Sequence, residues 1–188
     1  MLNYEFGYKR RMQIIPTTLP GVMLLKSAKH GDERGYLVRT YCATAFAAAN
    51  LNTHWQQSSI TCSPTKHTLR GMHFQQPPYA EIKLIRCLTG VVWDCLVDVR
   101  PDSPSYGQWE SFELSEDNSN SLYVPAGIAH GFLSLTPDVR LHYSMSAEYS
   151  AAHASGLRWN DPALAISWPA SPVVIAAKDL TWPLLNEQ

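Results

Sequence analysis

Short apolar runs with a two-residue period are the feature that most constrains the fold of this chain. In residues 91–99 the odd positions are Val, Trp, Cys, Val and Val, and the even positions are Val, Asp, Leu and Asp. Successive side chains of a β-strand point to opposite faces, so this period predicts a strand. Turn-rich segments such as residues 101–104 and 116–118 lie between runs of this kind. The pattern predicts an all-β fold, either a sandwich or a small barrel.

The other predicted elements are short. Because Thr89-Gly90 separates residues 82–88 from residues 91–99, these two runs are expected to form a hairpin. Residues 43–49 are expected to be helical, and the last forty residues, rich in Pro and Ala, are expected to wrap the barrel as short helical or irregular segments. With no repeat or linker, one domain over residues 1–188 is expected. The remaining predicted strands are residues 37–41, 58–61, 109–114, 121–124, 131–135 and 141–146.

Composition excludes several classes of function. No apolar run is long enough to span a bilayer, so no membrane partner is expected. Fifteen basic and sixteen acidic residues give a net charge of −1, which argues against a nucleic-acid partner. The four cysteines, Cys42, Cys62, Cys87 and Cys95, have no paired short spacing, so free thiols are expected. The chain is therefore expected to be reduced and cytoplasmic.

The most informative segment for chemistry runs from Leu69 to Leu84, where His73 and Lys83 lie on either side of a Pro-rich break. A base beside a fixed cation suits proton abstraction next to a carbonyl: the base takes the C–H proton and the cation stabilises the charge that develops on oxygen. Strand alternation would put His73 on one face with Leu69 and Gly71, and Arg70 and Met72 on the other. The alternatives are a hydrogen-bonded structural histidine and a lysine that faces solvent.

A second histidine, His130, belongs to the pattern Pro-x-Gly-x-x-His over residues 125–130. This pattern resembles the second motif of the cupin superfamily, in which the histidine points into a barrel. A metal site formed by His73, Glu81 and His130 would lack the second imidazole of the first cupin motif. Because nickel, zinc and non-haem iron favour imidazole-rich sets, metal catalysis is not expected.

Tyr143 lies in a run whose alternation puts it on one face with Leu141, and His142 and Ser144 on the other. Its phenol is a usable proton donor if it reaches a reacting carbon or oxygen. An interior tyrosine with a satisfied hydroxyl is the alternative. No sequence pattern around Asp179, near the end of the chain, indicates a functional role for it.

Together these residues resemble the dTDP-4-dehydrorhamnose 3,5-epimerase family of sugar-nucleotide epimerases, over about residues 21–185. The resemblance implies a cupin-like β jelly roll with short peripheral helices, and a homodimer that works without metal or organic cofactor. It further implies a nucleotide-linked 4-keto-6-deoxy sugar as substrate. The motifs that carry it are GDERGYL (31–37), TLRGMHFQ (68–75), KLIRCLTGVVWDCLVDVR (83–100), SPSYGQW (103–109), LYVPAGIAHGF (122–132), WNDP (159–162) and KD (178–179).

The resemblance also implies roles for individual residues. His73 matches the general base and Asp179 the carboxylate that orients it, an arrangement that raises imidazole basicity. Lys83 matches the group beside the 4-keto oxygen, where it would stabilise an enolate. Tyr143 matches the acid that returns a proton to the other face, and Tyr149 a second active-site tyrosine.

Recognition residues are implied in the same way. His130 matches an interior histidine close to the substrate. Arg34 and Arg70 match basic residues near the diphosphate, a task suited to the guanidinium group.

The chain departs from the family pattern at two places near the expected nucleoside pocket. Arg39 stands where many members have glutamate, and Gln57-Ser58-Ser59 stands where the family often has Gln-x-Asn. The nucleobase or the sugar is therefore left open, although Gln57, Ser59 and Arg39 are still expected to bind substrate. A mono-epimerase acting at carbon 3 or 5 is one alternative. A metal-dependent cupin oxygenase and a non-catalytic sugar-nucleotide-binding protein are the others.

Overall fold

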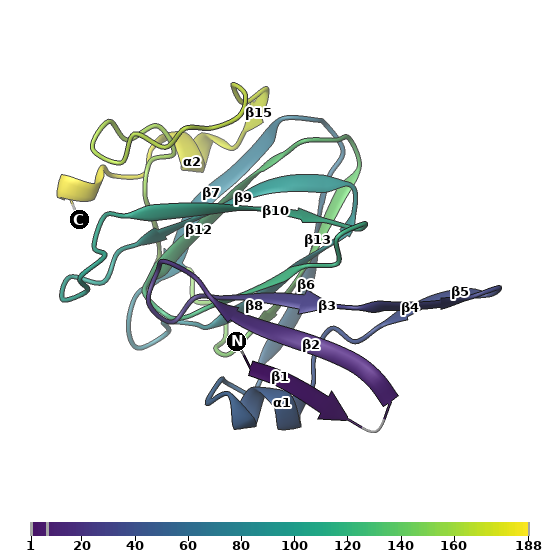
Figure 1. Cartoon of the computed structure of the whole chain (residues 1–188). Helices are drawn as coiled ribbons and strands as arrows, with labels where there is room; N and C mark the ends of the chain where they lie inside the picture. Colours follow the sequence, from purple (N-terminus) through teal and green to yellow (C-terminus); the bar gives the residue numbers. More distant parts are fainter. Residues whose placement is uncertain (1, 7, 188) are drawn as a thin grey trace.

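The computed structural model describes residues 2–6 and 8–187 (Figure 1). Within this part of the chain the strands form a seven-stranded sheet, a six-stranded sheet and a separate two-stranded hairpin. The seven-stranded sheet has the order β1 (Leu2–Phe6), β2 (Tyr8–Pro16), β3 (Met23–Ser27), β11 (Ser121–Val124), β8 (Lys83–Thr89), β13 (Val139–Met145) and β6 (Gln57–Ser63). All of its strand pairs are antiparallel.

The six-stranded sheet faces it across the barrel. It has the order β10 (Trp109–Ser115), β9 (Val91–Asp98), β12 (Ile128–Ser134), β7 (Thr68–Gln75) and β14 (Ala154–Gly156), and β15 (Val174–Ile175) pairs with β7 in parallel. The remaining elements are the hairpin strands β4 (Lys29–Asp32) and β5 (Gly35–Val38), the helices α1 (Ala43–Ala48) and α2 (Ala177–Leu180), and the 3₁₀ turn η1 (Leu185–Glu187). The all-β jelly roll with short peripheral helices, expected from the sequence, is confirmed.

Strand β9 follows the alternation that its sequence predicts. Val92 and Leu96 are fully buried in the core between the two sheets, together with Ile85 of β8. Cys95 and Val97 are buried on the opposite face, against residues of the C-terminal segment such as Leu157. Both faces of β9 are therefore covered, because the C-terminal segment wraps the six-stranded sheet, as expected. It does so with short helical and irregular pieces and also with the short strands β14 and β15, which were not expected. Each fully buried Val or Leu of this kind contributes roughly 1.5–3 kcal/mol.

The predicted hairpin between residues 82–88 and 91–99 is wrong. β8 pairs with β11 and β13 in one sheet, whereas β9 pairs with β10 and β12 in the other. Between them Gly90 has a φ of +77°, and a Cβ there would lie 2.4 Å from the hydroxyl of Thr136. This glycine lets the chain turn from one sheet into the other within one residue. The consecutive strands β8 and β9 therefore belong to opposite walls of the barrel.

The N-terminal third contains strands that the sequence analysis did not predict. β2 and β3 extend the seven-stranded sheet, with Ile14 opposite Leu25, both buried. The strand predicted at residues 37–41 is shifted: β5 spans Gly35–Val38 and pairs only with β4. Among the described residues, no helix is long and apolar enough to cross a membrane.

Candidate active site

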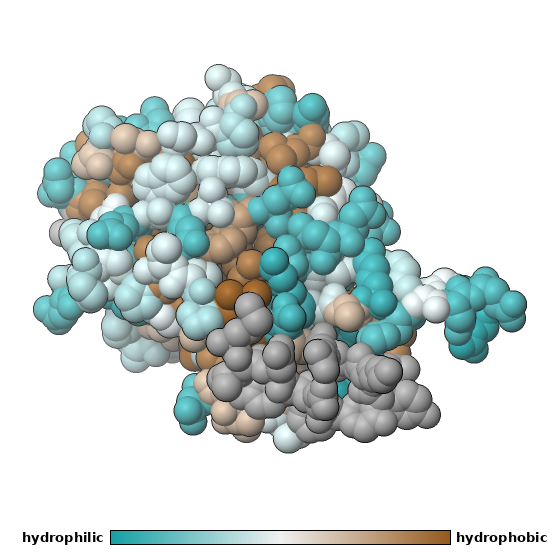
Figure 2. All heavy atoms as spheres, in the orientation of Figure 1, coloured by the Kyte–Doolittle hydropathy of each residue, from teal (hydrophilic) through white to brown (hydrophobic). Residues whose placement is uncertain are grey.

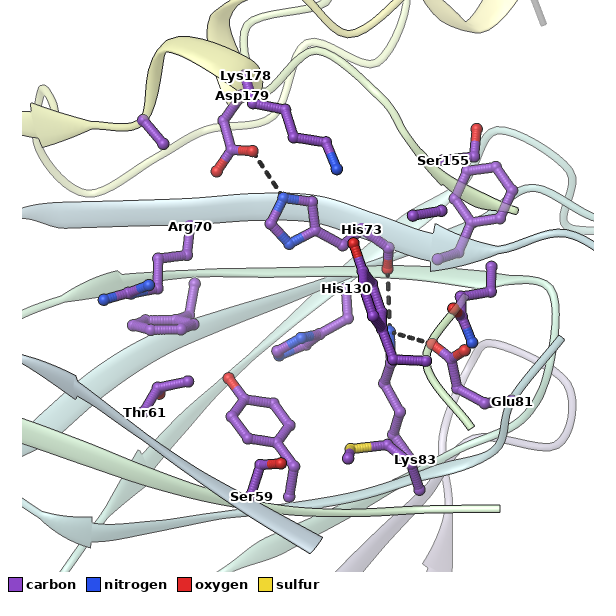
Figure 3. A pocket seen from close by; sticks show the side chains of 18 of the residues that line it. Ser59, Thr61, Arg70, His73, Glu81, Lys83, His130, Ser155, Lys178 and Asp179 are labelled. Atoms are coloured by element: carbon purple, nitrogen blue, oxygen red, sulfur yellow. Dashed lines mark hydrogen bonds and ion pairs between the residues drawn. The ribbon is translucent and has the colours of Figure 1, made fainter. Parts of the chain in front are cut away.

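A cavity of about 630 Å³ lies between the two sheets, and residues of the C-terminal segment contribute to its lining (Figure 3). Strands β6, β8 and β13 of the seven-stranded sheet form one wall, and β7 and β12 of the six-stranded sheet form the other. Helix α2 and the residues around it contribute to the rim. The predicted site residues that line the cavity are Gln57, Ser59, Arg70, His73, Lys83, His130, Tyr143, Tyr149 and Asp179.

Strand β7 brings Arg70 and His73 to the same cavity, which simple alternation does not allow. The expectation that these two side chains lie on opposite faces is therefore wrong. In the pairing with β12, His73 faces His130 and Arg70 faces Phe132, so two residues of β7 lie opposite one of β12. This is a β-bulge, and the extra residue reverses the order of faces along the strand. Gly71 lies in the bulge with a φ of +127°.

His73 is paired with a buried carboxylate. Its Nε2 lies 2.7 Å from Oδ1 of Asp179, whose side chain is only 5% exposed. Burial alone would raise the pKa of Asp179, but hydrogen bonds donated by His73, Gly71 and Trp182 outweigh it and hold that pKa below its usual range. The ionised carboxylate accepts the Nε2 proton, so Nδ1 is left as the basic nitrogen, and Figure 3 shows it turned toward the cavity.

Lys83 reaches the cavity wall from β8. Its Nζ lies 3.0 Å from Oε1 of Glu81 and 3.2 Å from the carbonyl oxygen of His73, and its side chain is 12% exposed. Solvent-facing placement, the alternative raised from the sequence, is therefore excluded. An ammonium group has three N–H donors, and these two contacts use two of them. The third is available to an acceptor in the cavity.

His130 lies on β12, deeper in the barrel. Its Nε2 is 2.8 Å from Oδ2 of Asp94 on β9, and both side chains are almost completely buried. Burial raises the pKa of Asp94, and the nearby His130 offsets part of this rise. The pair places a polar group at the floor of an otherwise apolar region.

Tyr143 stands on the wall opposite His73. It extends from β13, and its ring centroid is 5.8 Å from that of His130. Burial, and then the negative charge of Asp94, raise the pKa of its phenol well above the usual value. The phenol is therefore protonated at neutral pH and can act as an acid. His73 and Tyr143 thus present a base and an acid from opposite sheets.

Other predicted residues line the outer part of the cavity. Tyr149 is 64% exposed, and its backbone N–H donates a hydrogen bond of 2.9 Å to the side-chain oxygen of Gln57. Ser59 lies on β6 beside them. Arg70 is held by hydrogen bonds to the side chain of Ser63 and the carbonyl of Cys62, at 3.2 and 2.9 Å.

Arg34 and Arg39 do not line the cavity of their own chain. Arg34 lies at the turn between β4 and β5, where its side chain is 84% exposed and bonds Asp32 at 2.6 Å. Arg39 follows β5. In Figures 1 and 2 this hairpin stands clear of the barrel.

Two cavity residues, Lys178 and Glu81, and one residue behind the cavity wall, Asp94, were given no catalytic or binding role from the sequence. Lys178 precedes Asp179 and lines the cavity, and its ammonium lies 4.7 Å above the ring of Trp182. Asp94 is the partner of His130, and the signal for it was a carboxylate within an apolar strand. Glu81, considered only as a metal ligand, pairs with Lys83.

The three residues weighed as metal ligands have other partners. His73 binds Asp179, Glu81 binds Lys83 and His130 binds Asp94. Over residues 2–6 and 8–187, no three His, Cys, Asp or Glu side chains are grouped closely enough to hold a metal ion.

Comparison with known proteins gives a consistent result. The model of a family described as dTDP-4-dehydrorhamnose 3,5-epimerase matches residues 16–187. A protein of that name from Sinorhizobium fredii is 42% identical over 167 residues, which cover 88% of this chain and 86% of the relative.

Solved structures agree. The dTDP-4-dehydrorhamnose 3,5-epimerase of Bacillus anthracis, with TDP and PPi bound, has a TM-score of 0.89 at 38% identity, covering 92% of this chain and 99% of that one. The dTDP-6-deoxy-D-glucose-3,5-epimerase of Legionella pneumophila, in complex with dTDP-4-keto-L-rhamnose, has a TM-score of 0.88 at 32% identity, covering 93% of each chain.

Proposed function

The chain belongs to the dTDP-4-dehydrorhamnose 3,5-epimerase family, and from that premise we propose that it epimerises carbons 3 and 5 of a nucleotide-linked 4-keto-6-deoxy sugar. The reaction is an isomerisation by proton removal and return through an enolate, carried out by the protein's own side chains. The substrate is of the dTDP-4-dehydro-6-deoxyglucose type, and the product of the dTDP-4-dehydrorhamnose type.

The observation that carries this proposal is the placement of a base and an acid on opposite walls of one cavity. His73, oriented by Asp179, faces it from β7, and Tyr143 faces it from β13. A carbon held between them can lose its proton to His73 on one face and receive one from Tyr143 on the other. Removal and return from opposite faces inverts the carbon, which is epimerisation.

Lys83 stabilises the intermediate. With the 4-keto oxygen at its free N–H donor, the ammonium group opposes the negative charge that develops there as the C–H bond breaks. Carbons 3 and 5 both flank this ketone, so one lysine serves both enolates. A base and an acid at such positions each contribute roughly a hundredfold to ten-thousandfold in rate.

The rest of the substrate extends toward the rim. We assign Arg70 to the diphosphate, because its guanidinium is fixed at the cavity edge. Gln57, Ser59 and the exposed ring of Tyr149 form the surface for the nucleoside, and His130 contacts the sugar from the floor. These assignments extend the family resemblance to the cavity residues of this chain.

We further propose that the chain is one domain that works as a homodimer. The β4–β5 hairpin stands away from the barrel, and Tyr36 and Leu37 on it are 53% and 51% exposed. An apolar pair on a projecting hairpin suits contact with a second copy. Arg34 and Arg39, on or beside this hairpin, would then reach the nucleotide of the partner subunit. A cytoplasmic location suits the four cysteines, all of which are free thiols.

Proton NMR of the 4-keto-6-deoxy sugar nucleotide with the enzyme in deuterated water tests the reaction. Deuterium at both C3 and C5, followed by rhamno-configured product, is expected. Exchange at one carbon would make the protein a mono-epimerase, and exchange at neither would refute the assigned substrate.

Two variants test the roles in the same assay. His73→Ala is expected to abolish exchange while nucleotide binding persists, and Lys83→Ala to slow exchange at both carbons by about a hundredfold or more. His54→Ala, which removes an exposed histidine away from the cavity, is the control.

A further inference from the structure

Glu81 is a buried carboxylate, and one of its two oxygens has no hydrogen-bond partner among the described residues. Its side chain is 6% exposed, and Oε1 pairs with Nζ of Lys83. Oε2 is also buried, and it has no hydrogen-bond partner among the described residues. Glu81 is among the residues that line the cavity, so its carboxylate lies at the wall where the substrate is proposed to bind. A buried acceptor without a donor is costly, so it points to a donor that arrives with the ligand.

Lys83 and Glu81 therefore offer complementary groups side by side. Lys83 has one N–H left after its bonds to Glu81 and to the carbonyl of His73, and Glu81 has one free oxygen. Figure 3 shows the two charged groups next to each other, with the His73 carbonyl reaching Lys83 from the opposite sheet. The ligand fragment that satisfies both is a carbonyl next to a hydroxyl, an α-hydroxyketone.

We propose that Glu81 accepts a hydrogen bond from the hydroxyl on carbon 3 of the sugar while Lys83 donates one to the ketone oxygen at carbon 4. The inference rests on the proposed function, which puts the ketone at Lys83. Of the two carbons beside that ketone, only carbon 3 bears a hydroxyl, since carbon 5 bears the methyl group and the ring oxygen. Glu81 thus distinguishes the two sides of the ketone and fixes which way the ring lies.

The contact persists through the reaction. When carbon 3 loses its proton it becomes planar, and its hydroxyl lies in the same plane as the oxygen on carbon 4. Adjacent groups on one wall can hold both oxygens in that plane. Glu81 therefore binds the enolate as well as the ketone, and it contacts substrate directly.

The backbone around Glu81 is fixed before substrate arrives. The N–H of Ile82 donates to the hydroxyl of Ser146 at 2.8 Å, and the N–H of Ser146 donates to the carbonyl of Ile82 at 3.0 Å. On the other side, the Gln75 amide donates to the carbonyl of Tyr79 at 2.9 Å. A carboxylate held on so constrained a segment is preorganised for recognition.

A simpler role for Glu81 is to balance the charge of Lys83, and substrate analogues separate the two. Exchange at C5 in deuterated water is measured with dTDP-4-keto-6-deoxyglucose and with its 3-deoxy analogue. Carbon 5 is the same in both, so any difference reports on the missing hydroxyl. If Glu81 acted only by balancing the charge of Lys83, Glu81→Ala would slow C5 exchange by the same factor with both substrates.

We expect the wild type to prefer the 3-hydroxy substrate in kcat/KM by about a hundredfold or more, because a site built to bond a hydroxyl rejects the analogue that lacks it. Glu81→Ala is expected to reduce this preference to within about tenfold. Glu81→Gln, which keeps the shape of the side chain and can turn an N–H₂ group toward the cavity, should reduce it as well if the alanine variant fails to fold. Glu113→Gln, at an exposed carboxylate on β10, should keep the full preference.

An equal preference in wild type and both Glu81 variants would overturn the inference, as would a wild type that exchanges both substrates equally well. If the wild type exchanges the hydrogen of neither C3 nor C5 in the 3-hydroxy substrate, the proposed function itself fails. The role proposed for Glu81 then fails with it.

Discussion

At the scale of single residues, the cavity is organised as pairs of charged or polar groups. His73 is paired with Asp179, Lys83 with Glu81, and His130 with Asp94. Charges can be kept in a partly dry site only if each has a partner. The resemblance supplied both members of the first pair, but only Lys83 and His130 of the other two. Asp94 lies 36 residues from His130, and such a contact exists only once the sheets have formed.

Asp179→Asn tests the first pair. The amide is neutral and cannot stabilise a protonated imidazole as the carboxylate does, so exchange is expected to fall by about a hundredfold or more. The fold should persist, because the amide oxygen can still accept from Gly71. Exchange rates and thermal melting check both points. Asp117→Asn, at an exposed turn, is the matched control, and an Asp179 variant within threefold of wild type would contradict the pairing.

Tyr143→Phe separates proton removal from inversion. Without the phenol, His73 can still remove a proton and return it to the same face. Deuterium should therefore enter the starting sugar at a rate within about tenfold of wild type, while inverted product falls by about a hundredfold or more. NMR follows both signals in one sample. Tyr106→Phe, at a tyrosine that is 42% exposed and outside the cavity, is the control. Product forming as fast as in the wild type would remove Tyr143 from the mechanism.

At the scale of elements, the period of the sequence predicted strands well and their partners poorly. The faces of β9 follow from its own residues, since the alternation is local. The hairpin between β8 and β9 was wrong because pairing is decided by strands distant in sequence: β8 lies between β11 and β13. The bulge in β7 was missed for the same reason, since an extra residue is visible only against a partner strand.

Gly71→Ala tests the bulge. A Cβ at Gly71 would lie 2.4 Å from the Cα of Gly131, in addition to the strain of its positive φ. We expect a loss of about 2–5 kcal/mol in the free energy of unfolding. Gly35→Ala is the control, because Gly35 has a similar φ of +124° and no atom within 4 Å of its Cβ position. It should lose only the strain, about 1–2 kcal/mol. Equal losses in urea unfolding would show that the close approach of β7 and β12 does not matter.

The turn after β9 predicts a pH dependence of stability. Burial opposes ionisation of Asp98, but hydrogen bonds from Arg100, Ser103 and Ser105 hold its pKa at about 2, below the ordinary 3.8. A depressed pKa stabilises the fold above pH 3.8, and this stability is lost as the pH falls toward 2. Asp98→Asn should therefore be less stable by about 2 kcal/mol near neutral pH, with a smaller gap in acid. Urea unfolding at two pH values checks this, and Asp102→Asn is the exposed control. If the difference in free energy of unfolding between the wild type and Asp98→Asn is the same at both pH values, the assigned pKa is contradicted.

At the scale of the whole molecule, one chain holds the groups proposed to be catalytic but not every group expected to bind the substrate. Arg34 was expected near the diphosphate, yet it lies on a hairpin that stands away from its own cavity (Figure 1). If the proposed homodimer places that hairpin over the partner's cavity, Arg34 can lie far from the cavity of its own chain and still bind a diphosphate in the partner. Whether Arg34 serves its own chain or a partner could not be deduced from residue order.

A mixed dimer tests this arrangement directly. Arg34→Ala and His73→Ala are each expected to be poorly active alone. In a dimer containing one of each, the subunit with Arg34→Ala keeps His73 and would receive Arg34 from its partner, which restores one complete site. Coexpression of the two variants at equal levels should therefore recover about a quarter of wild-type activity, since half of the dimers are mixed and each has one working site. Should Arg34 act within its own chain, the mixed dimer has no complete site and no activity returns.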